Sequence, residues 1–171
     1  MRAAFVSIVF LAATAWAQDS KAVATAEAAC GPQSVNFSVK QDATDHPVPQ
    51  PDTGKALVYI VQSDTAHIGS ALIKIGMDGA WMGANQGTSY LFFPAEPGEH
   101  HLCVNWQSRV DYRSHFFGMA NFTAEPDHIY YFREHILESR AGIYFDFDQI
   151  NSDQGKYLVA LSAHSISHPK K

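Results

Sequence analysis

The sequence predicts an all-β protein, an antiparallel β-sandwich of seven or eight short strands that ends in a short helix. Three observations lead to this fold class. Short runs rich in β-branched and aromatic residues follow one another along the chain, turn residues separate these runs, and almost no helical periodicity occurs before residue 150. A chain of 171 residues is also long enough to bury one hydrophobic core.

The predicted strands differ in how many of their faces are apolar. Residues 34–40 alternate apolar and polar side chains and predict a first strand. Residues 55–62 are apolar on both faces, which indicates a central strand. Residues 143–149 alternate most regularly, so we expect one buried face and one face in water. The remaining runs are residues 71–77, 80–82, 89–93, 99–107, 116–124 and 128–136.

Two dipeptides predict the turns between strands. Asp78-Gly79 is a strong signal for a two-residue hairpin loop, because both residues tolerate a positive φ. Pro97-Gly98 combines a fixed φ with a permissive one and favours a type II turn. Both turns connect neighbouring runs, and they therefore favour antiparallel pairing.

A short helix is predicted near the end of the chain. Asn151 and Gln154 have the spacing of a capping box, and Tyr157, Leu158 and Leu161 then recur at helical intervals.

The sequence patterns divide the chain into four segments. These are a signal peptide (1–17), an N-terminal extension and Pro-rich linker with one strand (18–53), the β-sandwich domain (54–164) and a tail (165–171).

The first seventeen residues have the pattern of a secretory signal peptide. Arg2 precedes an apolar run, and Ala15 and Ala17 supply the small residues of a cleavage site. The alternatives are a retained membrane anchor, for which the run is short, and lipidation at Cys30, which polar residues separate from the run. We expect an exported protein, periplasmic or extracellular, with no transmembrane segment after cleavage.

The charge of the chain limits the classes of partner that it can bind. The formal net charge is −5 at pH 7, and the sequence offers no basic stripe for phosphate, which argues against nucleic-acid binding. We expect an unidentified protein or glycan partner. Cys30 and Cys103 are an even count in an exported chain and are predicted to form a disulfide. The alternative is a reactive or metal-binding thiolate, which no Cys-x-x-Cys motif supports.

Several short motifs resemble those of a known family. Residues 30–32 (CGP), 54–59 (GKALVY), 75–79 (IGMDG) and 97–100 (PGEH) resemble secreted bacterial proteins of the domain of unknown function 2846 family, over roughly residues 50–162. The Asp-Gly hairpin and Pro-Gly-x-His strand are also similar to PEGA and carboxypeptidase-regulatory-like sandwich modules, which are generally non-catalytic. The resemblance implies a sandwich fold and export, and it implies no reaction.

The polar residues give two weaker hypotheses. Among the nine histidines, His101 shares a strand face with Cys103 whereas His100 points the other way, so we predict no metal site and no cofactor. Asp146 and Asp148 share one strand face at about 7 Å, a spacing used by acid and base carboxylates. A metal-dependent or carboxylate-based hydrolase is therefore the alternative function, but no nucleophile motif accompanies these residues and we assign no catalytic residue.

Aromatic side chains that we predict to be exposed favour a binding function over an enzymatic one. Tyr112, Tyr130 and Tyr144 are amphipathic rings that we predict to lie at the surface, where they can stack on a sugar or grip a partner. The expected function is therefore that of a non-catalytic binding or envelope-associated module.

Overall fold

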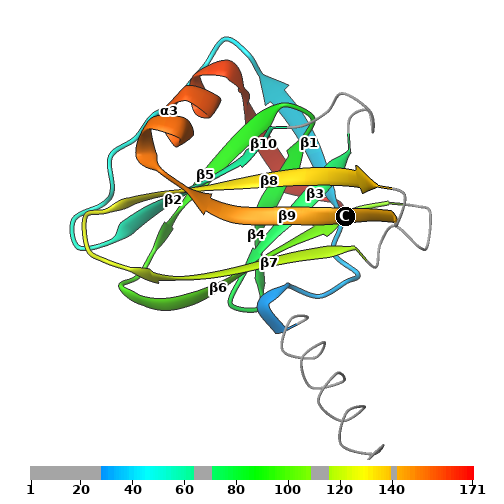
Figure 1. Ribbon diagram of the computed structural model, residues 1–171, viewed down its shortest axis with the longest axis horizontal. Coiled ribbons are helices and arrows are strands. Elements are labelled where there is room, and N and C mark those ends of the chain that lie inside the picture. Colours follow the sequence, from blue (N-terminus) through cyan, green and yellow to red (C-terminus); the bar gives the residue numbers. More distant parts are fainter. Residues whose placement is uncertain (1–27, 64–70, 109–115, 140–141) are drawn as a thin grey trace, which may run out of the picture.

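A computed structural model describes residues 28–63, 71–108, 116–139 and 142–171, and its described part contains ten strands and the helix α3 (Figure 1). The predicted number of strands, seven or eight, was therefore too low. The elements are β1 (Phe37–Asp42), β2 (Ala56–Gln62), β3 (Leu72–Met77), β4 (Ala80–Gln86), β5 (Ser89–Ala95), β6 (Gly98–Trp106), β7 (Phe117–Ala124), β8 (Ile129–Ser139), β9 (Gly142–Ile150), α3 (Ser152–Leu161) and β10 (Ala163–Pro169).

The strands form two sheets that pack face to face in a sandwich-like arrangement. One sheet has six strands in the order β1-β10-β5-β2-β8-β9, and the other has four in the order β4-β3-β6-β7. The prediction of purely antiparallel strands was wrong for two pairs, since β2–β8 and β10–β5 are parallel. A parallel pair needs a crossover connection, and between β2 and β8 the chain crosses to the four-stranded sheet, which provides it.

The main core lies between the two sheets. Residues of seven strands (β2, β3, β5, β6, β7, β8 and β9) point into it, as β2 illustrates with Val58 and Ile60, both fully buried. On β9, Phe147 is buried and Phe145 packs against the same core, whereas Tyr144 is half exposed. The alternation predicted for this strand is therefore confirmed at these three positions.

The predicted hairpin at Asp78-Gly79 joins β3 to β4. Asp78 (φ 51°) and Gly79 (φ 86°) both adopt the positive φ that a type I′ turn requires. The Asp78 carboxylate also contacts Nδ1 of His100 at 2.6 Å, and Nε2 of His100 lies 2.6 Å from the Glu96 carbonyl oxygen. Burial lowers the pKa of His100, but these hydrogen bonds and the charge of Asp78 raise that pKa by more, so the net shift is upward. His100 thus connects the β3–β4 turn to the turn between β5 and β6.

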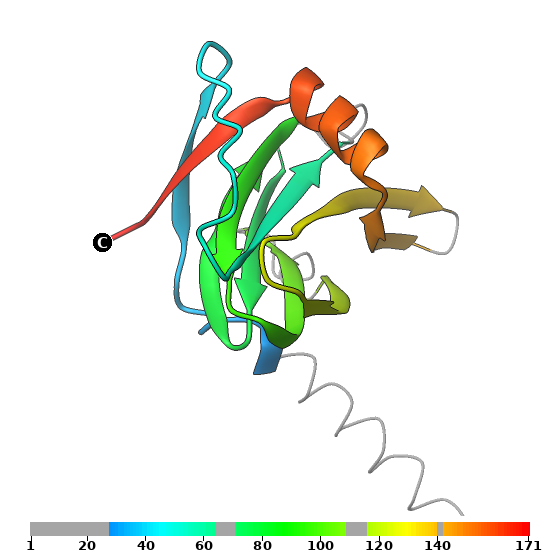
Figure 2. The same ribbon diagram turned by 90° about the vertical axis from the view of Figure 1, so that its left-hand side faces the viewer.

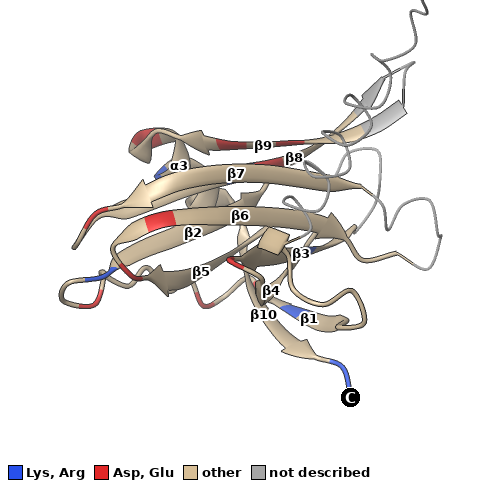
Figure 3. Ribbon diagram, turned by 90° about the horizontal axis from the view of Figure 1, so that it is seen from below, with Lys and Arg blue, Asp and Glu red and all other residues tan. Residues whose placement is uncertain are grey.

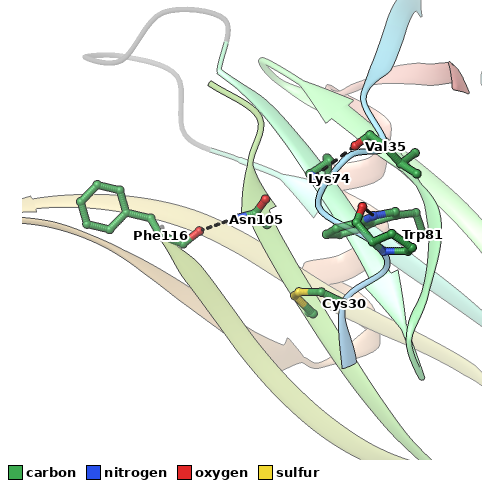
Figure 4. The surroundings of a disulfide bond; sticks show 8 residues. Cys30, Val35, Lys74, Trp81, Asn105 and Phe116 are labelled. Carbon is green, nitrogen blue, oxygen red and sulfur yellow. Dashed lines mark hydrogen bonds between the residues drawn. A yellow bond between two sulfur atoms is a disulfide. The ribbon is translucent and has the colours of Figure 1, made fainter. Parts of the chain in front are cut away.

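The predicted disulfide between Cys30 and Cys103 is confirmed, with 5.3 Å between the two Cα atoms. It holds the N-terminal segment across the outer face of the four-stranded sheet, where the Trp81 indole nitrogen donates to the Pro32 carbonyl oxygen at 2.8 Å. Figure 4 shows Lys74 beside Trp81 in this layer; its ammonium group lies 4.3 Å from the indole centroid. Burial lowers the pKa of Lys74 to about 8.

The end of the chain confirms one prediction and corrects another. The predicted helix is α3, and its N-cap Asn151 accepts a hydrogen bond from the Gln154 backbone nitrogen at 2.9 Å, as the capping spacing indicated. The residues assigned to a tail lie mostly in β10, which pairs antiparallel with β1. The 18–53 segment is thereby joined to the main sheet through its own strand. In the described ranges, no helix has the length and apolarity needed to cross a bilayer.

Candidate functional site

The six-stranded sheet carries a second apolar layer on its outer face. Strand β2 is buried on both faces, so Leu57, Tyr59 and Val61 point away from the main core. Tyr90 of β5 and Tyr131 of β8 point to the same side and complete this layer. A sheet face this apolar needs a cover, and two segments of the chain provide one.

The Pro-rich linker between β1 and β2 forms one part of the cover (Figure 2). The Tyr90 hydroxyl donates to the Pro47 carbonyl oxygen at 3.1 Å, and the Tyr59 hydroxyl donates to the Pro49 carbonyl oxygen at 3.4 Å. Both prolines are half-buried, whereas Val48 between them is 57% exposed. Prolines at alternate positions favour an extended backbone, which presents successive carbonyl groups to the tyrosines.

The helix α3 forms the other part of the cover, and a glycine sets how close it comes. A Cβ atom built on Gly155 would lie 2.2 Å from Cγ of Tyr131, far inside van der Waals contact. Because glycine lacks that atom, the helix backbone rests directly on the Tyr131 ring. Val159, one turn further along, is buried in the same layer.

A cavity of about 350 Å³ remains between the linker and α3. Its floor is formed by Tyr59 and Tyr131, whose rings stack with their centroids 5.1 Å apart. We call this site the tyrosine pocket. The residues that line it are His46, Val48, Tyr59, Tyr131, Lys156, Val159 and Ala160.

Two polar groups that line the tyrosine pocket can donate a hydrogen bond to a ligand, the Tyr131 hydroxyl and the Lys156 ammonium group. Tyr131 is only 3% exposed, and its hydroxyl has no hydrogen-bond partner among the described residues. Burial raises the pKa of Tyr131, and burial together with Tyr131 and Tyr90 raises the pKa of Tyr59, so both phenols stay neutral. Lys156 is exposed at the rim and adds a positive charge. The site thus combines an apolar floor with donors that suit an acceptor or an anion.

The three tyrosines named from the sequence do not gather at this pocket. Tyr112 lies outside the described residues. The Tyr130 hydroxyl donates to the Thr123 carbonyl oxygen at 3.0 Å and accepts from the Glu125 backbone nitrogen at 3.0 Å, which ties β8 to the preceding turn. Tyr144 is 51% exposed and pairs with Leu137, seven residues along β8 from Tyr130 and so about 23 Å away by strand rise.

The carboxylates of the alternative hypothesis lie on the outer face of β9, where Figure 3 shows acidic residues along the strand. Arg133 of β8 lies between them, with its guanidinium 3.3 Å from Asp148 and 3.9 Å from Asp146. Within the described residues, no three His, Cys, Asp or Glu side chains converge as metal ligands do. His67 and His115 are outside the described residues.

Sequence reasoning missed the tyrosine pocket. Tyr131 was among the aromatic residues of a predicted strand, and Tyr59 lay in the run that is apolar on both faces. That run contained the usable signal, because a strand with two apolar faces needs a cover on each. The sequence does not show that the linker and the final helix form the second cover. No local pattern in either segment indicates that it packs against β2 or β8.

Comparisons with protein-family models, with curated proteins and with solved structures find no match for this chain.

Proposed function

We propose that the protein is an exported, non-catalytic binding module that holds a small apolar ligand with an anionic end in the tyrosine pocket. The observation that carries this proposal is the Tyr131 hydroxyl, which belongs to a side chain only 3% exposed, has no hydrogen-bond partner in the described part of the chain, and borders an apolar cavity. This hydroxyl is not among the enclosed polar atoms of the described residues, so it opens on the cavity and can donate to a ligand acceptor there.

The size and lining of the pocket support a small ligand rather than a protein surface. Ligand pockets are typically concave, mostly apolar and of about 300–1,000 Å³, with a few polar groups that orient the ligand. The stacked rings of Tyr59 and Tyr131 offer a flat floor to an aromatic or alicyclic body. The ammonium group of Lys156 favours a carboxylate at the rim.

The location in this proposal is the periplasm or the outside of the cell. The Cys30–Cys103 disulfide supports it, because disulfides persist in oxidising compartments. The signal-peptide pattern of residues 1–17 and the resemblance to the domain of unknown function 2846 family point the same way. An envelope-associated role is part of this proposal.

Calorimetric titration with 2-naphthoate tests the proposed ligand class. We expect saturable binding to the disulfide-bonded protein. Tyr131→Phe, which keeps the ring and removes the hydroxyl, should weaken binding by about 2- to 12-fold, the value of one hydrogen bond of 0.5–1.5 kcal/mol. Tyr144→Phe is the matched control and should leave the affinity unchanged. Absence of binding, or equal loss in both variants, would refute the assignment.

The charge at the rim has its own test. Lys156→Met should weaken 2-naphthoate by about two- to fivefold, as an exposed ion pair is worth up to 1 kcal/mol. Naphthalene-2-carboxamide has nearly the same shape without the charge, and its affinity should be the same in both proteins. Lys40→Met, a change on the exposed side of β1, is the control for the loss of a cation elsewhere.

A further inference from the structure

The outer face of the six-stranded sheet carries a row of three tyrosines on neighbouring strands. Tyr90 lies on β5, Tyr59 on β2 and Tyr131 on β8, and these strands are adjacent in the sheet. The ring centroids of Tyr90 and Tyr59 are 6.2 Å apart, and those of Tyr59 and Tyr131 are 5.1 Å apart. The row is therefore continuous across the three strands.

Two of the three hydroxyls hold the Pro-rich linker of the chain itself. Tyr90 donates to the Pro47 carbonyl oxygen at 3.1 Å. Tyr59 donates to the Pro49 carbonyl oxygen at 3.4 Å. An extended backbone advances about 3.1–3.4 Å per residue, so two residues cover about 6.2–6.8 Å, which is close to the 6.2 Å between the two rings. A proline at every second position therefore matches the spacing of these tyrosines.

The alternation of burial in the linker indicates that its prolines face the tyrosines. Pro47 and Pro49 are half-buried, whereas Val48 between them is 57% exposed. Proline suits this contact, because its ring is apolar and its fixed φ lowers the entropy lost when the backbone is ordered. The linker thus shows, within one molecule, how this sheet face binds an extended segment that contains proline.

The third tyrosine of the row has no such carbonyl group. After Pro49 the linker turns into β2, and the Lys55 nitrogen donates to the Asp52 carbonyl oxygen in that turn. The Tyr131 hydroxyl has no hydrogen-bond partner among the described residues, and Tyr131 lines the cavity between the linker and α3. The row therefore offers one phenol donor beyond the two that hold the linker.

We infer that the ligand of the tyrosine pocket is the carboxyl-terminal end of an extended peptide with proline at alternate positions. The inference rests on the proposed function and names the class of its ligand. A prolyl carbonyl oxygen within the peptide accepts from the Tyr131 hydroxyl, in the way that the linker carbonyls accept from the other two tyrosines. The terminal carboxylate lies at the rim, near the ammonium group of Lys156.

The size and the walls of the cavity agree with a short chain end. The volume of about 350 Å³ is at the lower end of the range for ligand pockets. Val48 of the linker and Val159 of α3 line the cavity from its two walls, so the peptide lies beside the linker. An interior segment of a protein has to enter and leave between these walls, whereas a chain end enters once and also supplies the anionic group.

Calorimetric titration with acetyl-Pro-Val-Pro, which repeats residues 47–49 and ends in a free carboxylate, tests the inference. We expect saturable binding. Replacing either proline of the peptide by alanine should weaken binding about 2- to 5-fold, because alanine loses more backbone freedom when it is ordered. An affinity no higher than that of acetyl-Ala-Val-Ala would overturn the inference.

The carboxamide form of the same peptide tests the anionic end. It should bind the unchanged protein about 2- to 5-fold more weakly than the carboxylate form, and Lys156→Met should abolish this difference. A carboxamide that binds as tightly as the carboxylate would show that the site does not recognise a chain end.

Tyr131→Phe keeps the ring and removes the donor. It should weaken acetyl-Pro-Val-Pro about 2- to 12-fold, whereas the control Tyr144→Phe, on the outer face of β9, should leave the affinity unchanged. Nuclear Overhauser effects should place the peptide prolines against Tyr131 and Val159. Contacts to Tyr90 instead would mean that the peptide displaces the linker, and they would contradict a site beside it.

Competition with 2-naphthoate separates the failure of this inference from the failure of the proposed function. We expect the peptide to displace 2-naphthoate from the unchanged protein. If 2-naphthoate binds and the peptide neither binds nor displaces it, the peptide class is wrong and the proposed function stands. If neither compound binds, both are wrong.

Discussion

Replacing Gly155 by alanine should destabilise this protein, although the same change stabilises most helices. In a helix interior, alanine is favoured over glycine by about 1 kcal/mol. At this position the new Cβ atom would lie 2.2, 2.5 and 2.6 Å from three atoms of Tyr131, where ordinary contacts begin near 3.4 Å. Tyr131 cannot retreat easily, because it is 3% exposed and stacks on Tyr59.

Either the ring or the helix must therefore move by about 1 Å or more. Overpacking of this kind costs about 1–3 kcal/mol, which exceeds the gain in helix propensity. After the gain in helix propensity is subtracted, we expect Gly155→Ala to lower the free energy of unfolding by up to about 2 kcal/mol, read from urea midpoints at an unchanged m-value.

A double-mutant cycle separates the clash from the propensity. In a Tyr131→Ala background the obstacle is gone, so Gly155→Ala should become neutral or stabilising by up to about 1 kcal/mol. The sign of the effect should thus reverse between the two backgrounds. Stabilisation by Gly155→Ala in the otherwise unchanged protein would mean that α3 does not rest on Tyr131, and the account of the pocket wall would fail.

Three further predictions follow from the described contacts. Because the pKa of His100 is raised in the folded protein, its contribution to stability is complete below pH about 6.5 and is lost as the pH rises through the folded-state pKa. The urea midpoint of His100→Gln should therefore fall less over this pH range than that of the unchanged protein. Cys30→Ser opens a disulfide with a sequence separation of 73 and should cost about 4 kcal/mol; an unchanged melting temperature would contradict this. Phe147→Ala should lower the free energy of unfolding by about 3–5 kcal/mol in a denaturant titration, whereas Tyr144→Ala should lower it much less. Equal losses in the two variants would contradict the assignment of one buried and one exposed face to β9.

Local features of this fold could be predicted from the sequence. The Asp78-Gly79 turn, the Asn151 cap and the alternation in β9 depend on neighbouring residues, and each was found where the pattern placed it. The prediction of the disulfide needed only the even cysteine count and the expectation that the chain is exported. Each of these signals has a physical cause that acts within a few residues or within one covalent bond.

Strand β10 could not be predicted, because its side chains are mostly polar. Its order comes from backbone pairing with β1 and from two serines that bond to Ala84 on the edge strand β4. Ser165 donates to the Ala84 carbonyl oxygen, and Ser167 accepts from the Ala84 nitrogen. A hydrophobic pattern carries no record of such contacts.

The parallel strand pairing and the candidate site also could not be predicted from the sequence. Parallel pairing of β2 with β8 depends on a long crossover rather than on either strand's residues. The tyrosine pocket requires the linker and α3 to meet on one sheet face.

The position of bound 2-naphthoate is the most direct test of whether the tyrosine pocket is the ligand-binding site. Nuclear Overhauser effects between the ligand's ring protons and the protein report which side chains lie within a few ångströms of it. The tyrosine pocket predicts contacts to the rings of Tyr59 and Tyr131 and to the methyl groups of Val159, and their loss in Gly155→Leu, whose side chain would displace Tyr131. Contacts confined to Tyr144 and the outer face of β9 would contradict the assignment of this pocket as the binding site.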